Sequence, residues 1–119
     1  LDQPNGIIGT SDGSLLYVSD IDRQMTYSYQ IEANGNLSSQ ELFVAMGSDG
    51  MTIDEFGNVY LTGEGISVFD PEGKKIEHIR IEEPWTSNVT FAGPNRDMLF
   101  ITASRAIYTI KMKVKGVER

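Results

Sequence analysis

Residues 49–61 read DGMTIDEFGNVYL, a short apolar strand followed by a Gly-Asn turn and a second apolar strand. The same order of strand, turn and strand occurs twice more, at residues 4–18 and 88–101. The polar residues that lead the three copies are Asn5, Asp49 and Asn88. They are 44 and 39 positions apart, close to the ~40 to 45 residues of a four-stranded propeller blade. The sequence therefore predicts three blade-like repeats.

Between the repeats, Gly and Asn mark turns, and the segments alternate apolar and polar residues with a period of two, which is typical of strands. We expect the first unit to supply strands at 7–10, 15–19, 25–31 and 40–45, the second at 51–54, 59–62, 66–70 and 75–81, and the third at 89–92, 98–102 and 106–115. This predicts an all-β fold, with residues 1–119 as a single partial β-propeller domain. Its blades would span about 1–46, 47–85 and 86–119, and the third would lack its outer strand.

Composition excludes several classes of function. The chain has 10 Lys and Arg against 17 Asp and Glu, a formal charge of −7, and no basic stripe, so a nucleic-acid partner is not expected. We expect no membrane association, because no run reaches the ~18 to 20 apolar residues of a span. The absence of Cys excludes disulfides and thiol nucleophiles and leaves the compartment open. Because the chain begins at Leu1 rather than Met, we expect a piece of a longer protein.

The repeat itself predicts a cation site. The innermost strand of each propeller blade lines the central channel, and Asn5, Asp49 and Asn88 would each come just before such a strand, at one mouth of the channel. Carboxylate and amide oxygens that converge on an axis suit a hard cation such as Ca²⁺. The alternative for each residue is an ordinary turn role, because Asn and Asp before Gly are common in turns.

Other residues with chemical potential give weaker signals. The single His, His78, falls in an alternating outer strand and is expected at the surface, and no G-x-S-x-G elbow is present to indicate a serine hydrolase. Gly63-Glu64-Gly65 lacks the strand-loop-helix context of a phosphate cradle and predicts a tight turn. Trp85 could either form the rim of a pocket or pack between blades.

Several ordered motifs resemble those of a known family. They are PNG at 4–6, SDGMTIDEFGNVY at 48–60, NVTFAGP at 88–94, LFIT at 99–102 and the segment 107–117. Together they resemble the gluconolactonase family, which includes regucalcin (senescence marker protein) and luciferin-regenerating enzyme. The resemblance implies a six-bladed propeller with one divalent ion at its axis, Ca²⁺ being the expected ion and Zn²⁺ or Mg²⁺ the alternatives, and hydrolysis of sugar lactones.

The resemblance also implies roles for three residues. It makes Asn5 a metal ligand, and Asp49 both a metal ligand and the catalytic base for the attacking water. Asn88 is expected to line the substrate pocket. The remaining family ligands, a Glu in the first blade and an Asn in a middle blade, belong to regions that this sequence does not contain.

We therefore expect the chain to be the C-terminal half of a metal-dependent sugar lactonase that is inactive by itself. The expected partners are a sugar lactone and either the N-terminal half of the propeller or a second copy of this chain. The alternative is a non-catalytic propeller that uses its mouth for binding, and a longer protein without the first-blade Glu would favour it. The sequence does not indicate which lactone is hydrolysed.

Overall fold

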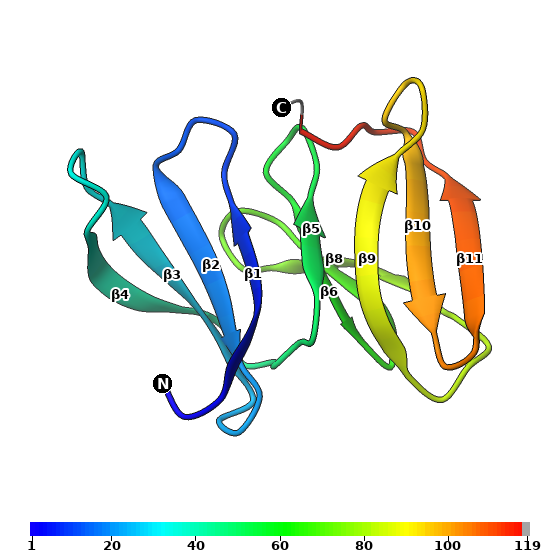
Figure 1. Ribbon diagram of the computed structural model, residues 1–119, viewed down its shortest axis with the longest axis horizontal. Helices are drawn as coiled ribbons and strands as arrows, with labels where there is room; N and C mark the ends of the chain where they lie inside the picture. The colour runs from blue at the N-terminus through cyan, green and yellow to red at the C-terminus, as the bar shows by residue number, and fades with distance from the viewer. Residues whose placement is uncertain (118–119) are drawn as a thin grey trace.

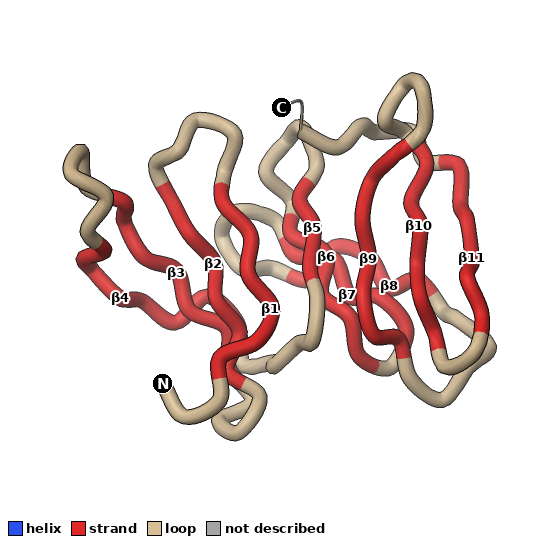
Figure 2. Tube along the Cα trace, viewed as in Figure 1, coloured by secondary structure: helices blue, strands red, loops and turns tan. Residues whose placement is uncertain are grey.

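The computed structural model describes residues 1–117, and every regular element in that range is a β-strand (Figure 2). The eleven strands are β1 (Pro4–Gly9), β2 (Leu15–Asp20), β3 (Met25–Ile31), β4 (Leu37–Val44), β5 (Met51–Ile53), β6 (Val59–Gly63), β7 (Gly65–Phe69), β8 (Lys75–Ile79), β9 (Thr86–Ala92), β10 (Met98–Ala103) and β11 (Ala106–Lys111). None of the described residues forms a helix that could cross a membrane.

The strands form three antiparallel sheets that stand side by side (Figure 1). Their strand orders are β1-β2-β3-β4, β5-β6-β7-β8 and β9-β10-β11, so each sheet is a run of consecutive hairpins. This arrangement confirms the prediction of an all-β fold built from propeller blades, with three strands in the last blade. We call the sheets blades 1, 2 and 3; the predicted end of blade 3 at residue 119 lies outside the described residues.

Four predicted strand limits were wrong by three or more residues, and several others by one or two. β1, β4 and β9 each begin three residues earlier than expected, so Asn5 and Asn88 lie inside their strands rather than before them. β11 ends at Lys111, not at residue 115, because its neighbour β10 begins at Met98, which pairs with Lys111. The alternation of half-buried and exposed residues continues to Lys115. Beyond Lys111, the Met112 amide still donates to the Asp97 carbonyl at 2.8 Å, but the chain ahead of β10 then enters the turn at residues 93–96.

The hydrophobic core lies between the blades. One cluster joins blades 1 and 2 and contains Tyr17, Val44, Met51, Ile53, Val59, Leu61 and Phe69. The other joins blades 2 and 3 and contains Tyr60, Ile66, Val68, Val89, Phe91, Leu99 and Ile101. Successive residues of β6 therefore enter different clusters, and each residue of β5, β6 and β7 is buried. In β10 burial alternates instead, since blade 3 has a neighbour on one face only.

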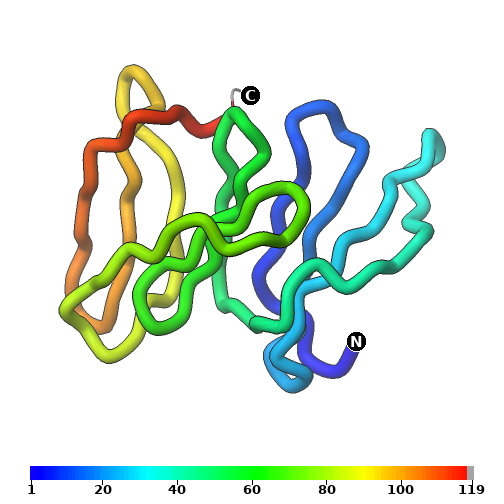
Figure 3. Tube along the Cα trace, turned by 180° about the vertical axis from the view of Figure 1, so that it is seen from behind, coloured from blue at the N-terminus to red at the C-terminus, as the bar shows by residue number. Residues whose placement is uncertain are grey.

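The segment after β11 crosses from blade 3 back to blade 2 (Figure 3). It forms a bridge between Gly116 and Asp54, and the amide of Glu55 donates to the Lys115 carbonyl at 2.8 Å. The buried Asp54 carboxylate accepts the Tyr60 hydroxyl at 3.0 Å, and burial together with this carboxylate raises the pKa of Tyr60. The bridge at Gly116 and the hydrogen bond to Lys115 fasten blades 2 and 3 together at one end.

Candidate cation and substrate site

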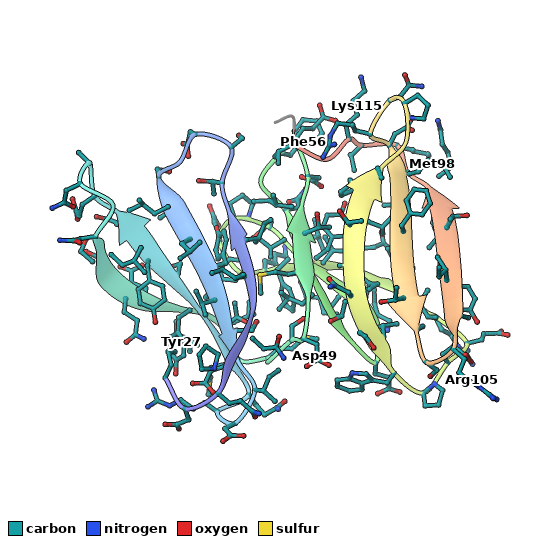
Figure 4. All side chains as sticks on the ribbon, viewed as in Figure 1. Tyr27, Asp49, Phe56, Met98, Arg105 and Lys115 are labelled. Carbon is teal, nitrogen blue, oxygen red and sulfur yellow. The ribbon has the colours of Figure 1, made fainter. Side chains whose placement is uncertain are left out.

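The innermost strands of the three blades, β1, β5 and β9, run side by side in the same direction (Figure 1). We call the end at which these strands begin the mouth. Asp49 lies at this end, whereas Phe56 and Lys115 mark the opposite end (Figure 4). The sequence predicts that polar side chains from all three blades meet at the mouth.

Asn5 and Asp49 are brought together across two blades. The Asn5 side-chain amide donates to Oδ1 of Asp49 at 3.3 Å. The β1–β2 pairing shifts register between Pro4 and Ile7, which places an irregularity at Asn5; irregularities of this kind commonly re-aim a side chain beside a functional site. Asn5 is therefore directed toward blade 2 by a local distortion of its strand.

The chain just before Asn5 is held by a buried carboxylate on β2. Asp20 accepts the amides of Asp2 at 2.6 Å and Gln3 at 3.1 Å, and it also accepts the amide of Arg23 at 3.2 Å. Burial acts to raise the pKa of Asp20, but these three backbone N–H groups outweigh it and hold the pKa below its usual value. The N-terminal approach to Asn5 is thus fixed.

Two glycines let the three blades approach one another at the mouth. A Cβ on Gly6 would lie 2.9 Å from the Ser48 carbonyl oxygen, to which the Gly6 amide donates at 3.2 Å. A Cβ on Gly50 would overlap the Asn88 side chain and lie 3.0 Å from its Cα. The glycine that follows each predicted ligand is therefore needed for close packing of the neighbouring blade.

Asp49 lies on a short loop that is held in place by hydrogen bonds to two buried hydroxyls. The Ser48 hydroxyl donates to the Gly50 carbonyl at 2.6 Å and accepts the Thr62 amide at 2.8 Å. The Thr62 hydroxyl accepts the Gly50 amide at 3.0 Å. Because both neighbours of Asp49 are tied to β6, the half-buried carboxylate projects from a rigid base.

Asn88 lies at the mouth beside the loop that carries Asp49. Its side chain packs against Gly50, and its Oδ1 accepts the amide of Val89 at 2.9 Å. Its contacts therefore differ from those of Asn5, which meets the carboxylate of Asp49 directly. Asn88 is exposed and thus accessible to a ligand that occupies the mouth.

Trp85 is a further member of this cluster, and it takes the first of its two expected places, at the rim rather than between blades. Its indole Nε1 donates to Oδ2 of Asp49 at 2.9 Å, so one carboxylate oxygen meets blade 1 and the other meets the segment leading into blade 3. The residue is 48% exposed and borders the mouth. No local motif marks this contact, because the two residues are 36 positions apart.

The donor chemistry at the mouth fits a hard divalent cation. The Asp49 carboxylate and the amide oxygens of Asn5 and Asn88 are oxygen donors of the kind that Ca²⁺ and Mg²⁺ prefer. Among residues 1–117, no three His, Asp or Glu side chains gather in a group that could hold a metal ion. Since Ca²⁺ takes six to eight oxygen ligands, these three side chains would supply only part of a coordination shell.

The remaining candidates lie elsewhere. His78 is exposed on β8, as predicted, and its Nδ1 is 3.3 Å from the Ser67 hydroxyl. Gly63-Glu64-Gly65 forms the predicted tight turn between β6 and β7, with Gly65 at a φ of 70°. A hollow of about 550 Å³ lies beside it, lined by His78, Arg80 and the acidic Glu64, Glu82 and Glu83 among others. None of these groups contacts Asp49.

The chain is similar in sequence and in structure to known proteins. Residues 1–105 match the family described as the SMP-30/Gluconolactonase/LRE-like region. A gluconolactonase of Zymomonas mobilis is 32% identical over 98% of this chain and 36% of its own length. The structure of a gluconolactonase from Xanthomonas campestris superposes with a TM-score of 0.83 at 27% identity, covering 98% of this chain and 39% of that one.

A calcium-binding protein, regucalcin from Agrobacterium tumefaciens, shares the fold with a TM-score of 0.85 at 23% identity, over 97% of this chain and 48% of that one. The chain spans 36% to 47% of the length of the curated relatives that it matches. The family match covers most of the sequence and includes the residues that form the mouth. The chain therefore belongs to the SMP-30/gluconolactonase/LRE-like family.

Proposed function

We propose that the chain is the C-terminal half of a divalent-cation-dependent lactonase that hydrolyses a sugar lactone. The observation that carries the proposal is the contact between Asn5 and Asp49, 3.3 Å apart on different blades and at one mouth. The blades are held together by apolar clusters. Packing of the blades therefore does not account for the contact between this amide and this carboxylate. The lactonase relatives supply the reaction class.

Asn5 and Asp49 are the residues of this chain that would hold the cation, with Ca²⁺ favoured by their oxygen donors. When bound, a divalent cation supplies Lewis-acid polarisation of the lactone carbonyl. Asp49 orients a water molecule and accepts its proton as that water attacks the carbonyl carbon. The acyl C–O bond of the ring then breaks, and Asp49 returns the proton to the leaving oxygen, which becomes a hydroxyl group. Asn88 lies beside Gly50, the residue after Asp49, and offers an amide that can hydrogen-bond to sugar hydroxyls.

We further propose that the ring is completed by other blades, which would also bring the missing ligands. Blade 1 exposes Ile7 and Leu42, at 57% and 56%, and blade 3 exposes Ile107 at 73%. Ile7 precedes Ile8, and Ile107 precedes Tyr108; Ile8 and Tyr108 pack against the two clusters that join these blades to blade 2. Because successive residues of a strand point to opposite faces, Ile7 and Ile107 are directed away from blade 2. Apolar side chains at both ends of the arc favour further blades there. Without those blades the chain is expected to be inactive.

Sedimentation of the isolated chain tests which blades close the ring. A second copy would give a species of twice 13.2 kDa, with two sets of mouth residues facing one channel. A monomer that associates on addition of an N-terminal half would instead assign closure to that half. A monomer that stays compact and never associates would contradict ring closure by either partner.

Asn5→Ala should weaken cation binding before it affects chemistry, because the substitution removes a ligand oxygen and leaves the base in place. We expect Ca²⁺ affinity to fall by a factor on the order of 10 to 100 in the protein whose ring is complete. Calorimetry gives the affinity, and gluconolactone turnover at limiting and saturating Ca²⁺ shows whether excess cation restores the rate. Unchanged affinity would refute the role of Asn5, and cation binding without turnover would favour a binding module.

A further inference from the structure

We propose that Trp85 is a positioning residue that fixes the orientation of the Asp49 carboxylate. The indole Nε1 donates to Oδ2 of Asp49 at 2.9 Å, whereas Asn5 approaches Oδ1 at 3.3 Å. The two oxygens of one carboxylate are therefore distinguished by their partners. The inference deepens the proposed function and rests on it for the importance of Asp49.

The chemistry of the two donors differs in a way that assigns their roles. An indole N–H can only donate, so Trp85 cannot become a cation ligand or accept a proton. The side-chain amide of Asn5 has both an oxygen and an NH₂ group and can present either one. Trp85 is thus a fixed contact of Oδ2. The other oxygen, Oδ1, faces Asn5, the residue that can bind a cation together with Asp49.

The backbone that carries Trp85 is anchored by the next residue. Thr86 is fully buried, and its hydroxyl accepts the Gly63 amide at 3.0 Å and donates to the Gly65 carbonyl at 2.6 Å. These bonds hold the start of β9 to the turn between β6 and β7. The indole therefore projects from a fixed point, as a positioning side chain requires.

Packing does not account for the place of Trp85. The residue is 48% exposed, and it belongs to neither of the hydrophobic clusters that join the blades. A large aromatic side chain that served the core would be buried there, as Tyr60 and Phe91 are. Its polar contact with Asp49 is instead what fixes the indole at the mouth.

Trp85 is the only tryptophan of the chain, so its indole N–H gives a single cross-peak in a ¹⁵N-correlated NMR spectrum of the full 119-residue chain. We expect Asp49→Asn to move this peak upfield, because a neutral amide oxygen accepts the N–H less strongly than a carboxylate does. Glu41→Gln makes the same change of charge at an exposed site on β4 and should leave the peak in place. A peak that ignores Asp49→Asn would overturn the proposal.

The converse variant, Trp85→Phe, keeps an aromatic ring and removes the donor. If Trp85 positions the carboxylate, the side-chain amide resonances of Asn5 should shift in this variant, because the carboxylate is then free to turn. In the ring-complete protein, kcat for gluconolactone should fall about tenfold while KM changes little. Unchanged Asn5 resonances and unchanged kcat would overturn the proposal. Dispersed backbone resonances verify the fold, and Asp49→Asn tests the same contact if Trp85→Phe fails to fold.

These results separate this inference from the proposed function. A wild-type ring-complete protein that does not hydrolyse lactones would refute the lactonase proposal. In that event the responses of the Trp85 and Asn5 resonances still decide whether Trp85 positions the carboxylate.

Discussion

Replacing Asp49 by Asn is expected to lower lactone turnover of the ring-complete protein by a factor on the order of 10² or more. By ring-complete we mean this chain together with the blades that close its ring. The amide keeps the shape of the side chain and can still accept the Trp85 N–H, but it carries no charge for a cation and cannot take a proton from water. Steady-state kinetics with gluconolactone measures the effect.

The matched control for Asp49→Asn is Glu41→Gln, which removes one negative charge from the exposed outer strand of blade 1. It should leave turnover within about twofold of the wild type, because screening makes the field of a distant exposed charge small at physiological ionic strength. Equal losses in the two variants would point to overall charge rather than to the mouth. Near-normal turnover with normal metal content in Asp49→Asn would refute its assigned role.

Leu99→Ala is expected to reduce the free energy of unfolding by about 2 to 5 kcal/mol. Leu99 is completely buried in the cluster between blades 2 and 3, where Val89, Phe91 and Ile101 are its neighbours in the core. Truncation leaves a cavity that the strands on either side cannot close, since both are held by their hydrogen-bonded ladders. Urea denaturation of the isolated chain, followed by tyrosine and tryptophan fluorescence, measures the change.

Ile107→Ala is the control for this substitution. Ile107 lies in the same blade but is 73% exposed, so its truncation should change the stability of the monomeric chain by about 0.5 kcal/mol or less. A large effect of Ile107→Ala that depends on protein concentration would show that this face is buried in an assembly. Equal, concentration-independent effects of the two variants would contradict the division of blade 3 into a core face and an open face.

Much of the fold could be predicted because its signals are local. Gly-Asn and Asp-Gly turns separate the strands, and period-two alternation identifies them, so the order of strands within each blade follows from the sequence. The exact ends do not follow as readily, because they depend on neighbouring strands. β11 has the alternating pattern as far as Lys115, and only the position of Met98 on β10 determines that pairing ends at Lys111.

The residues of the mouth also differ in how far the sequence predicts them. Asn5, Asp49 and Asn88 could be selected because they recur with the repeat, and the repeat places equivalent positions at one end of the blades. Trp85 kept two possible places, the rim of a pocket or the packing between blades, because it has no counterpart at the same position in the other repeats. The hydrogen bond that joins it to Asp49 depends on how the segment before β9 folds back toward blade 2, which only the tertiary structure determines.

We place Asp49 and Asn5 in a cation-dependent lactonase site. Lactone turnover by the ring-complete protein, measured after removal of divalent cations with a chelator and again after Ca²⁺ is restored, tests this claim most directly. We expect turnover to be lost with the cation and to return with it in the wild type, whereas Asp49→Asn should stay lower than the cation-loaded wild type by a factor on the order of 10² or more in both conditions. Full turnover by the cation-free protein, or recovery of Asp49→Asn to the wild-type rate, would contradict it.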